Sequence, residues 1–276
     1  MTMYNVNTLP TSSAVLASMW KNRNLLKQLW MRDFSIRYKN GVLGIAWALL
    51  NPLMMLTLYS FVFVFVFQMR WGSGPDTKGN FVILLFTGLV VHGFFAEFIT
   101  RAPQLITSNS SYVKKVVFPL ELLPLMPLLS ALVNFFVGMI LVCFLLFYLQ
   151  GNIPLTIVFL PFIITPYALM VLGLSYFLAA TGVFVRDLTH VVGIISTIAM
   201  FASPVLFPIE NVPENFRIYL YANPLTVIVE QLRDVSILGN APDWWSLLIY
   251  TAAAAVVFAI GFSWFQATRK GFADVL

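Results

Sequence analysis

The feature that most constrains this sequence is an uncharged, apolar run from Ile45 to Phe67. A helix needs about 20 apolar residues to cross the hydrocarbon core of a bilayer. A helix is the expected form because lipid offers the backbone no hydrogen-bond partners. The run therefore predicts a membrane-spanning helix. The basic segment from Lys21 to Lys39, which precedes it, would keep its first end in the cytoplasm.

The composition extends this interpretation to the whole chain. Of the 276 residues, 60% are hydrophobic and 10% are charged, whereas a soluble domain carries about 25% charged residues. The net charge is +5, but the basic residues lie in loops between apolar runs and form no basic domain. We therefore expect one transmembrane domain over residues 1–276, with anionic membrane lipids as partners and no nucleic acid.

Further apolar runs follow the first and are separated by polar or proline-containing loops. The fold class that we predict is an all-α membrane protein with six transmembrane helices. The predicted spans are residues 45–67, 81–100, 128–149, 155–184, 191–207 and 244–266.

Two other regions are too polar to cross a membrane. Residues 16–39 have the pattern of an amphipathic helix that lies in the membrane interface, although a surface helix packed on protein would look similar. Residues 209–243 predict re-entrant helices on the periplasmic side, which would act as a gate region. Residues 1–15 are polar and are expected to be flexible.

The distribution of Lys and Arg predicts the orientation. With the N-terminus in the cytoplasm, twelve of these residues fall in inner segments and four in outer ones. Because short cytoplasmic loops retain positive charge, we expect both termini in the cytoplasm of a bacterium, with the chain threaded through its inner membrane.

Ionisable residues within a span are costly and are usually functional. The second predicted span contains His92 and Glu97, to which we assign a structural or gating role. Glu97 could pair with Arg101 four residues later. His92 and Glu97 could also be a catalytic pair, but on a helix they point about 140° apart. The sequence has no nucleotide-binding motif of the Walker type, no Asp-x-Asp pair that could hold a sugar nucleotide through a metal, and no nucleophilic Ser elbow. A membrane glycosyltransferase or acyltransferase is therefore the weaker alternative, and no catalytic or metal-binding residue is assigned.

Five segments together resemble a known family. They are Arg37–Pro52, Gly88–Glu97, Asn109–Leu123, Val185–Pro208 and Asn223–Arg233. In that order they are similar to the permease subunits of ABC exporters for O-antigen, capsule and teichoic acid polysaccharides. The resemblance implies export of a lipid-linked polysaccharide, with O-antigen on polyprenyl pyrophosphate preferred. Capsule, teichoic acid, drug or lipid cargo on the same fold stays open.

The resemblance also implies partners and sites. The chain would pair with a second copy and with two separate ATPase subunits, which would bind ATP and Mg²⁺, while this chain binds no cofactor itself. The expected ATPase-docking residues are Arg101, Lys114, Lys115, Arg186 and Asp187. The residues expected near the pyrophosphate at the membrane interface are Arg32, Arg37 and Lys39. The pore or gating candidates are His92, Glu97, Glu230 and Arg233.

Overall fold

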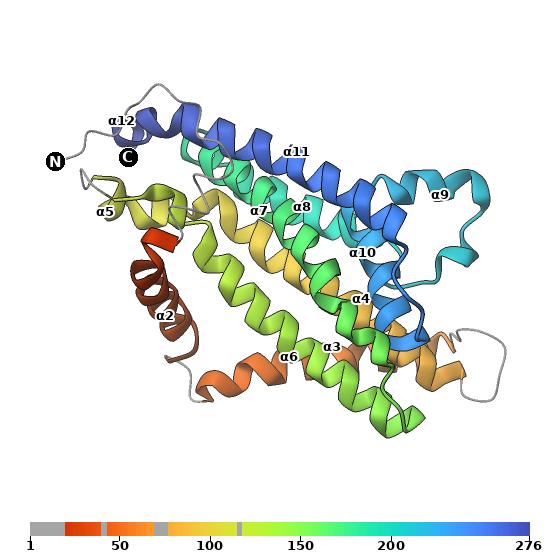
Figure 1. Ribbon diagram of the computed structural model, residues 1–276. Helices are drawn as coiled ribbons and strands as arrows, with labels where there is room; N and C mark the ends of the chain where they lie inside the picture. The colour runs from red at the N-terminus through yellow and green to blue at the C-terminus, as the bar shows by residue number, and fades with distance from the viewer. Residues whose placement is uncertain (1–19, 40–42, 69–76, 115–117) are drawn as a thin grey trace.

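The computed structural model describes residues 20–39, 43–68, 77–114 and 118–276. All regular elements in these ranges are helical, and none of the described residues forms a strand. Figure 1 shows the long helices running side by side as one bundle. The predicted all-α class is therefore confirmed. The segment 1–15, predicted to be flexible, lies outside the described residues.

Within the described ranges, five helices are long and apolar enough to cross a membrane. Their boundaries lie close to those of five predicted spans, because an uninterrupted apolar run in lipid has to satisfy its backbone within a helix. They are α3 (Trp47–Ser60) with its π-helical extension η2 (Phe61–Val66), α4 (Thr77–Arg101), α6 (Leu125–Gln150), α7 (Leu160–Phe184) and α11 (Trp244–Thr268).

The remaining predicted span, 191–207, is not a full-length helix. Helix α8 covers Leu188–Phe201, which corresponds to about 21 Å at 1.5 Å per residue against a hydrocarbon core of about 30 Å. The chain leaves the helix at Ala202, before Pro204, which cannot continue it. Hydropathy predicted the apolar character of this stretch correctly but placed the helix end too late.

The core is built from two closely packed helix pairs, α7 with α11 and α4 with α6, and α4 also contacts α7. Helices α7 and α11 approach so closely that a Cβ built on Gly173 would lie 2.5 Å from the Cα of Phe258. Small residues allow such close approach between helices in lipid. Tyr176 of α7 is fully buried and makes edge-to-face contacts with Phe262 and Phe265 of α11. Helices α7 and α11 are therefore a closely packed pair.

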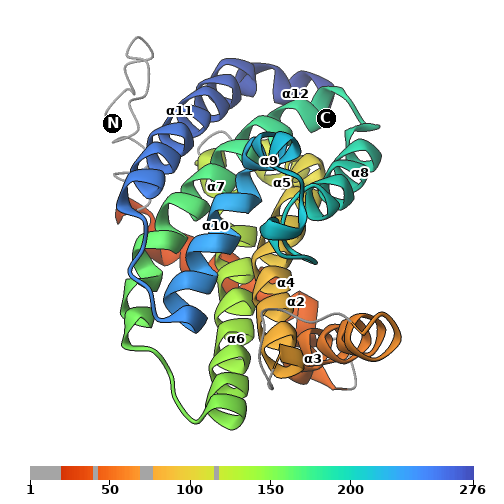
Figure 2. The same ribbon diagram turned by 90° about the vertical axis from the view of Figure 1, so that its right-hand side faces the viewer.

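Helix α3 lies at the margin of the bundle. Figure 2 places α3 and α8 on one side and α11 on the other. In α3 itself no side chain is buried, and Val64 is the one buried side chain of its extension η2. The outward-facing side chains include Met54 and Leu58 of α3 and Phe61 of η2. An apolar surface of this kind must contact lipid or another protein.

Helix α2 (Arg23–Lys39) precedes the bundle. Its Leu26 and Leu29 are buried and the helix packs beside α6, whereas Trp20 is 75% exposed. Part of the predicted apolar face thus packs on protein, and the rest remains exposed on the surface of the chain.

Between α8 and α11 the predicted gate region folds into two short helices. These are α9 (Glu214–Tyr221) and α10 (Pro224–Arg233), with η7 (Ile209–Asn211) before them and the π-turn η8 (Asp234–Leu238) after them. They lie at the opposite end of the bundle from α5 and α12 (Figure 1). The other short elements are η1 (Gly44–Ala46), η3 (Ala102–Gln104), η4 (Thr107–Asn109), α5 (Ser110–Val113), η5 (Leu120–Leu122), η6 (Leu155–Phe159), η9 (Arg269–Gly271) and α12 (Phe272–Val275).

Candidate functional site

A cavity of about 620 Å³ lies between α3 and the helices α4, α6 and α8. Its volume is within the range of about 300 to 1,000 Å³ that is common for small-molecule sites. Most of its wall is apolar. The polar side chains that line it are Trp47, Asn51, Tyr59, His92, Glu97 and Asn134. A polar strip at this depth needs a reason, because lipid-exposed polar groups are costly.

One polar contact of the cavity wall joins α4 to α6. The Nδ2 of Asn134 donates to the Oε2 of Glu97 at 2.7 Å. Glu97 was predicted as a pore or gating residue, whereas Asn134 was not singled out. Its signal was an amide in the middle of the apolar run 128–149.

His92 bonds to a different helix. Its Nε2 lies 3.1 Å from the backbone oxygen of Ser196 in α8, and since a carbonyl can only accept, the ring nitrogen donates. His92 and Glu97 thus line one cavity but connect α4 to α8 and to α6, respectively. Their separate partners do not favour the catalytic pair considered from the sequence.

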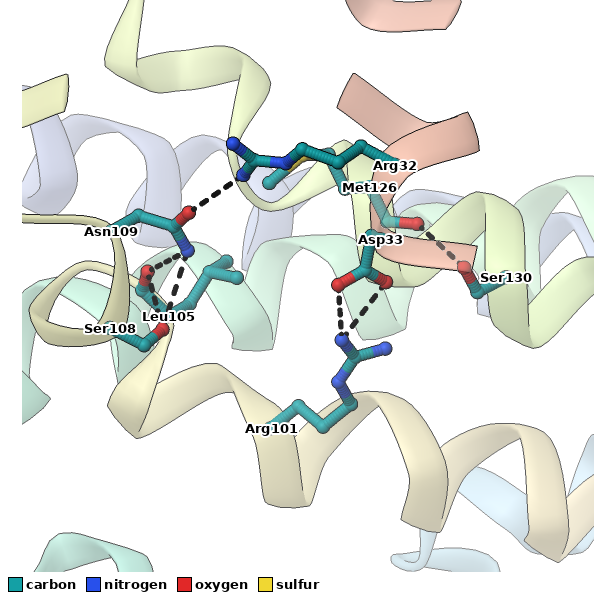
Figure 3. Close-up of polar contacts among 8 residues, drawn as sticks. All are labelled: Arg32, Asp33, Arg101, Leu105, Ser108, Asn109, Met126 and Ser130. Carbon is teal, nitrogen blue, oxygen red and sulfur yellow. Dashed lines mark hydrogen bonds and ion pairs between the residues drawn. The ribbon is translucent and has the colours of Figure 1, made fainter. Parts of the chain in front are cut away.

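The end of α4 is tied to α2 by an ion pair. Nη2 of Arg101 donates to both carboxylate oxygens of Asp33, at 2.7 and 2.9 Å (Figure 3). The predicted pairing of Arg101 with Glu97 is therefore replaced by one that crosses between helices. Both partners are partly exposed, so the pair contributes about 1 kcal/mol or less to stability.

Arg32 makes a second contact from α2, to the segment before and within α5. Its Nη1 donates to the hydroxyl of Tyr112 at 2.5 Å and its guanidinium lies 5.2 Å from the centre of that ring. Its Nη2 approaches the Oδ1 of Asn109 at 3.5 Å (Figure 3). The side chains of the other two interface candidates, Arg37 and Lys39, lie outside the described residues.

The docking candidates gather at one end of the molecule. Lys114 is exposed at the end of α5, and Arg186 and Asp187 are exposed in the turn between α7 and α8. Figure 1 places α5 and this turn at the same end. Arg101 is held inward there by Asp33, and Lys115 lies outside the described residues.

Arg233 is the most buried cation that the structure describes, with 5% of its surface exposed. Its guanidinium donates to three backbone carbonyls: Leu84 of α4 at 3.0 and 2.9 Å, Pro204 at 2.6 Å and Val205 at 3.1 Å. Burial lowers the pKa of Arg233 to about 9, so the group remains charged at neutral pH. Arg233 was predicted as a pore or gating residue. In the structure its side chain lies inside the protein and is bonded to backbone carbonyls.

These bonds explain how the chain can leave the helix after α8. Residues 202–208 are largely buried, and carbonyls that no longer bond within a helix need other donors. Arg233 supplies them for Pro204 and Val205. Asn223 is a further donor, since its Nδ2 donates to the backbone oxygens of Ala199 at 2.8 Å and Ala202 at 2.9 Å. The same Asn223 side chain also caps α10 by accepting from the backbone of Leu225.

Glu230 stands one turn before Arg233 on α10. It is half-buried and forms a side-chain hydrogen bond with Tyr221 of α9. Burial, the largest influence, raises the pKa of Glu230. This contact connects the two short helices of the predicted gate region.

Comparison with known proteins gives a consistent result along the chain. Residues 24–237 match the family model described as ABC-2 type transporter. An O-antigen export system permease protein RfbA from Myxococcus xanthus is 27% identical over 263 residues, which cover 94% of this chain and 98% of that protein. The protein of the same name from Klebsiella pneumoniae is 26% identical, covering 92% and 95%. The polysialic acid transport protein KpsM from Escherichia coli is 24% identical, covering 89% and 93%.

Proposed function

The chain belongs to the ABC-2 type transporter family and is a membrane permease, and we propose that its cargo is a lipid-linked polysaccharide. The observation that carries the proposal is the match to O-antigen export permeases from end to end, over 92% and 94% of this chain. We place O-antigen on polyprenyl pyrophosphate first among the cargoes. The similarity to KpsM supports capsular polysaccharide as the second candidate.

The chemistry of such a cargo agrees with the fold. A hydroxylated polymer cannot cross about 30 Å of hydrocarbon without losing hydrogen bonds to water, each loss costing several kcal/mol. A path with polar and aromatic walls removes this cost. The cavity beside α3 provides such walls on one chain, and the polar side chains of its lining are the support for a transport path.

We propose that two copies of the chain form the complete path. Helices α3 and α8 and the extension η2 present large apolar side chains outward, among them Leu58, Phe65, Ile194 and Ile198. A second copy packed on this side would cover them. In this arrangement α8 and the bend 202–208 together make the sixth crossing, so that both termini lie in the cytoplasm.

The energy for transport would come from ATP hydrolysis on separate subunits. The sequence has no Walker-type motif, which supports two separate ATPase subunits that bind ATP and Mg²⁺. We propose that they dock at the end that carries Arg101, Lys114, Arg186 and Asp187, with Lys115 as a further docking residue. Arg32, Arg37 and Lys39 would then lie near the pyrophosphate at the inner face of a bacterial inner membrane, and α9 and α10 would form the periplasmic gate.

Deleting the gene and staining for surface polysaccharide tests the cargo. We expect the surface glycan to be lost and its lipid-linked precursor to accumulate inside the cell, with both effects reversed by the intact gene. A normal surface glycan in the deletion strain would reject the polysaccharide cargo. ATPase activity that requires a co-expressed nucleotide-binding subunit is the matching biochemical result.

A further inference from the structure

The chemistry of the cavity beside α3 indicates which part of the cargo it can hold. Among the residues that the structure describes, no Lys or Arg lines the cavity, and the one acidic side chain in its wall is Glu97. A pyrophosphate in this partly apolar cavity would find no described cation with which to pair, and an unpaired buried charge is costly. A ligand that offers hydroxyl groups would instead donate to Glu97.

The position of the polar groups supports this assignment. Along α4, Glu97 lies about 6 Å and His92 about 13 Å from the level of Arg101, at 1.5 Å per residue. The polar strip therefore begins about one helical turn inside the cationic end of the bundle, where Arg32 and Arg101 lie, and continues inward. Arg32 and Arg101 therefore lie at the end of the bundle, and Glu97 lies further along α4, toward the middle of the bundle.

Aromatic side chains face the same space from α3. Trp47 and Tyr59 line the cavity and, being twelve residues apart, are separated by about 18 Å along the helix. Aromatic rings combine a large apolar face with a polar edge, a combination that suits sugar rings, whose faces are apolar and whose edges carry hydroxyls. Hydrocarbon chains would fit the aromatic wall but would leave Glu97 and Asn134 facing an apolar ligand.

We propose that this cavity, within a single chain, binds uncharged sugar units of the cargo, with Glu97 and Asn134 as the hydroxyl-binding pair. The site is separate from the cationic end that would meet the pyrophosphate. This inference rests on the proposed function, because it assumes that the cargo is a polysaccharide.

Cysteine protection in cells tests the inference. Gly93 lines the cavity, and a Cβ built on it meets no other atom within 4 Å, so Gly93→Cys should fold normally. Asn152→Cys, in the exposed turn after α6, is the water-accessible control. Both variants are made with Cys143→Ala and expressed with the ATPase partner. They are labelled with a small neutral maleimide after ATP depletion, in cells that make the glycan and in cells that lack its first sugar transferase.

We expect Gly93→Cys to react at least threefold more slowly in the glycan-producing cells and Asn152→Cys to react equally in both. Equal rates for Gly93→Cys, or no reaction in either strain, would overturn the proposal. Surface staining of the same cells distinguishes a failure of the sugar site from a failure of the proposed function. If deleting the gene removes the surface glycan but Gly93→Cys is not protected, the sugar site fails and the exporter stands; if the glycan remains after deletion, the proposed function itself fails.

A second measurement concerns the pair itself. Glu97→Gln keeps one acceptor oxygen and should lower glycan export by less than threefold, whereas Glu97→Leu should lower it at least tenfold. Both are compared at equal protein amount and equal melting temperature. The same export for both variants at equal stability would contradict a role of Glu97 in binding hydroxyls.

Discussion

Helices α3 and α4 are equally apolar in sequence, yet they have opposite positions in the fold. In the most apolar 18-residue stretch of each, 67% of the residues of α4 are buried but only 6% of those of the α3 segment. Hydropathy measures the preference of a helix for a non-aqueous surrounding, and protein and lipid satisfy it equally well. The difference therefore shows which helix stabilises the bundle and which one is left to meet a partner or the membrane.

The largest effect should come from the close contact between the core helices. Gly173→Leu places a side chain against the backbone of Phe258, and we expect a loss of about 3 kcal/mol or failure to fold. Gly193→Leu on the marginal helix α8, where a Cβ meets nothing within 4 Å, should leave the melting temperature in detergent unchanged. Equal melting temperatures for the two variants would remove the distinction between core and margin.

The next effect concerns the buried guanidinium. Arg233→Met removes the donors of three carbonyls in a buried place, and we expect a loss of about 2 to 4 kcal/mol. Arg217→Met on α9 removes bonds to the backbone of Glu210 and Val212, but at the surface, so about 1 kcal/mol or less should be lost. Thermal unfolding of the purified chains measures both losses of stability. A larger loss for Arg217→Met than for Arg233→Met would contradict the prediction.

A smaller effect should follow from the ion pair that joins α2 to the core. Asp33→Asn leaves Arg101 without its charged partner and should cost about 0.5 to 1 kcal/mol, less at high salt. A double-mutant cycle with Arg101→Gln isolates the pair. If its coupling energy is zero at low salt, the ion pair does not stabilise the position of α2, which then depends on its other contacts, such as the burial of Leu26 and Leu29 and the bond of Arg32 to Tyr112.

The smallest effect on stability is expected on α3. Leu58 is 56% exposed, so Leu58→Ala should change the stability of the isolated chain by less than about 0.5 kcal/mol. If a second copy covers α3, the same substitution should weaken dimerisation, measured by light scattering in detergent. A large loss of stability in the monomer would show that α3 packs on its own bundle.

The sequence was sufficient for the helices because lipid leaves the backbone few alternatives. It was not sufficient for the end of α8, where the apolar run continues past the point at which Pro204 stops the helix. Whether a bend is tolerated there depends on Arg233, which lies 29 residues further along the chain. A local hydropathy pattern contains no such information.

The candidate site was predictable to a similar degree. His92 and Glu97 were identified because ionisable groups in an apolar run are unusual. Their partners, Ser196 and Asn134, were not identified, since each lies on another helix and the packing of helices decides which side chains meet. The expected pairing of Glu97 with Arg101 used spacing on one helix and missed the competing partner Asp33.

Gly88 has a consequence for how related sequences can vary. A Cβ at this position would lie 2.7 Å from the backbone oxygen of Val205 and 3.0 Å from Nη2 of Arg233, so the long side chain fits because the glycine has none. Loss of Arg233 would leave the glycine still required, because the backbone of Val205 stands against the same position. Across homologues, arginine at position 233 should therefore be found only with glycine at position 88, whereas glycine at position 88 should also be found without the arginine.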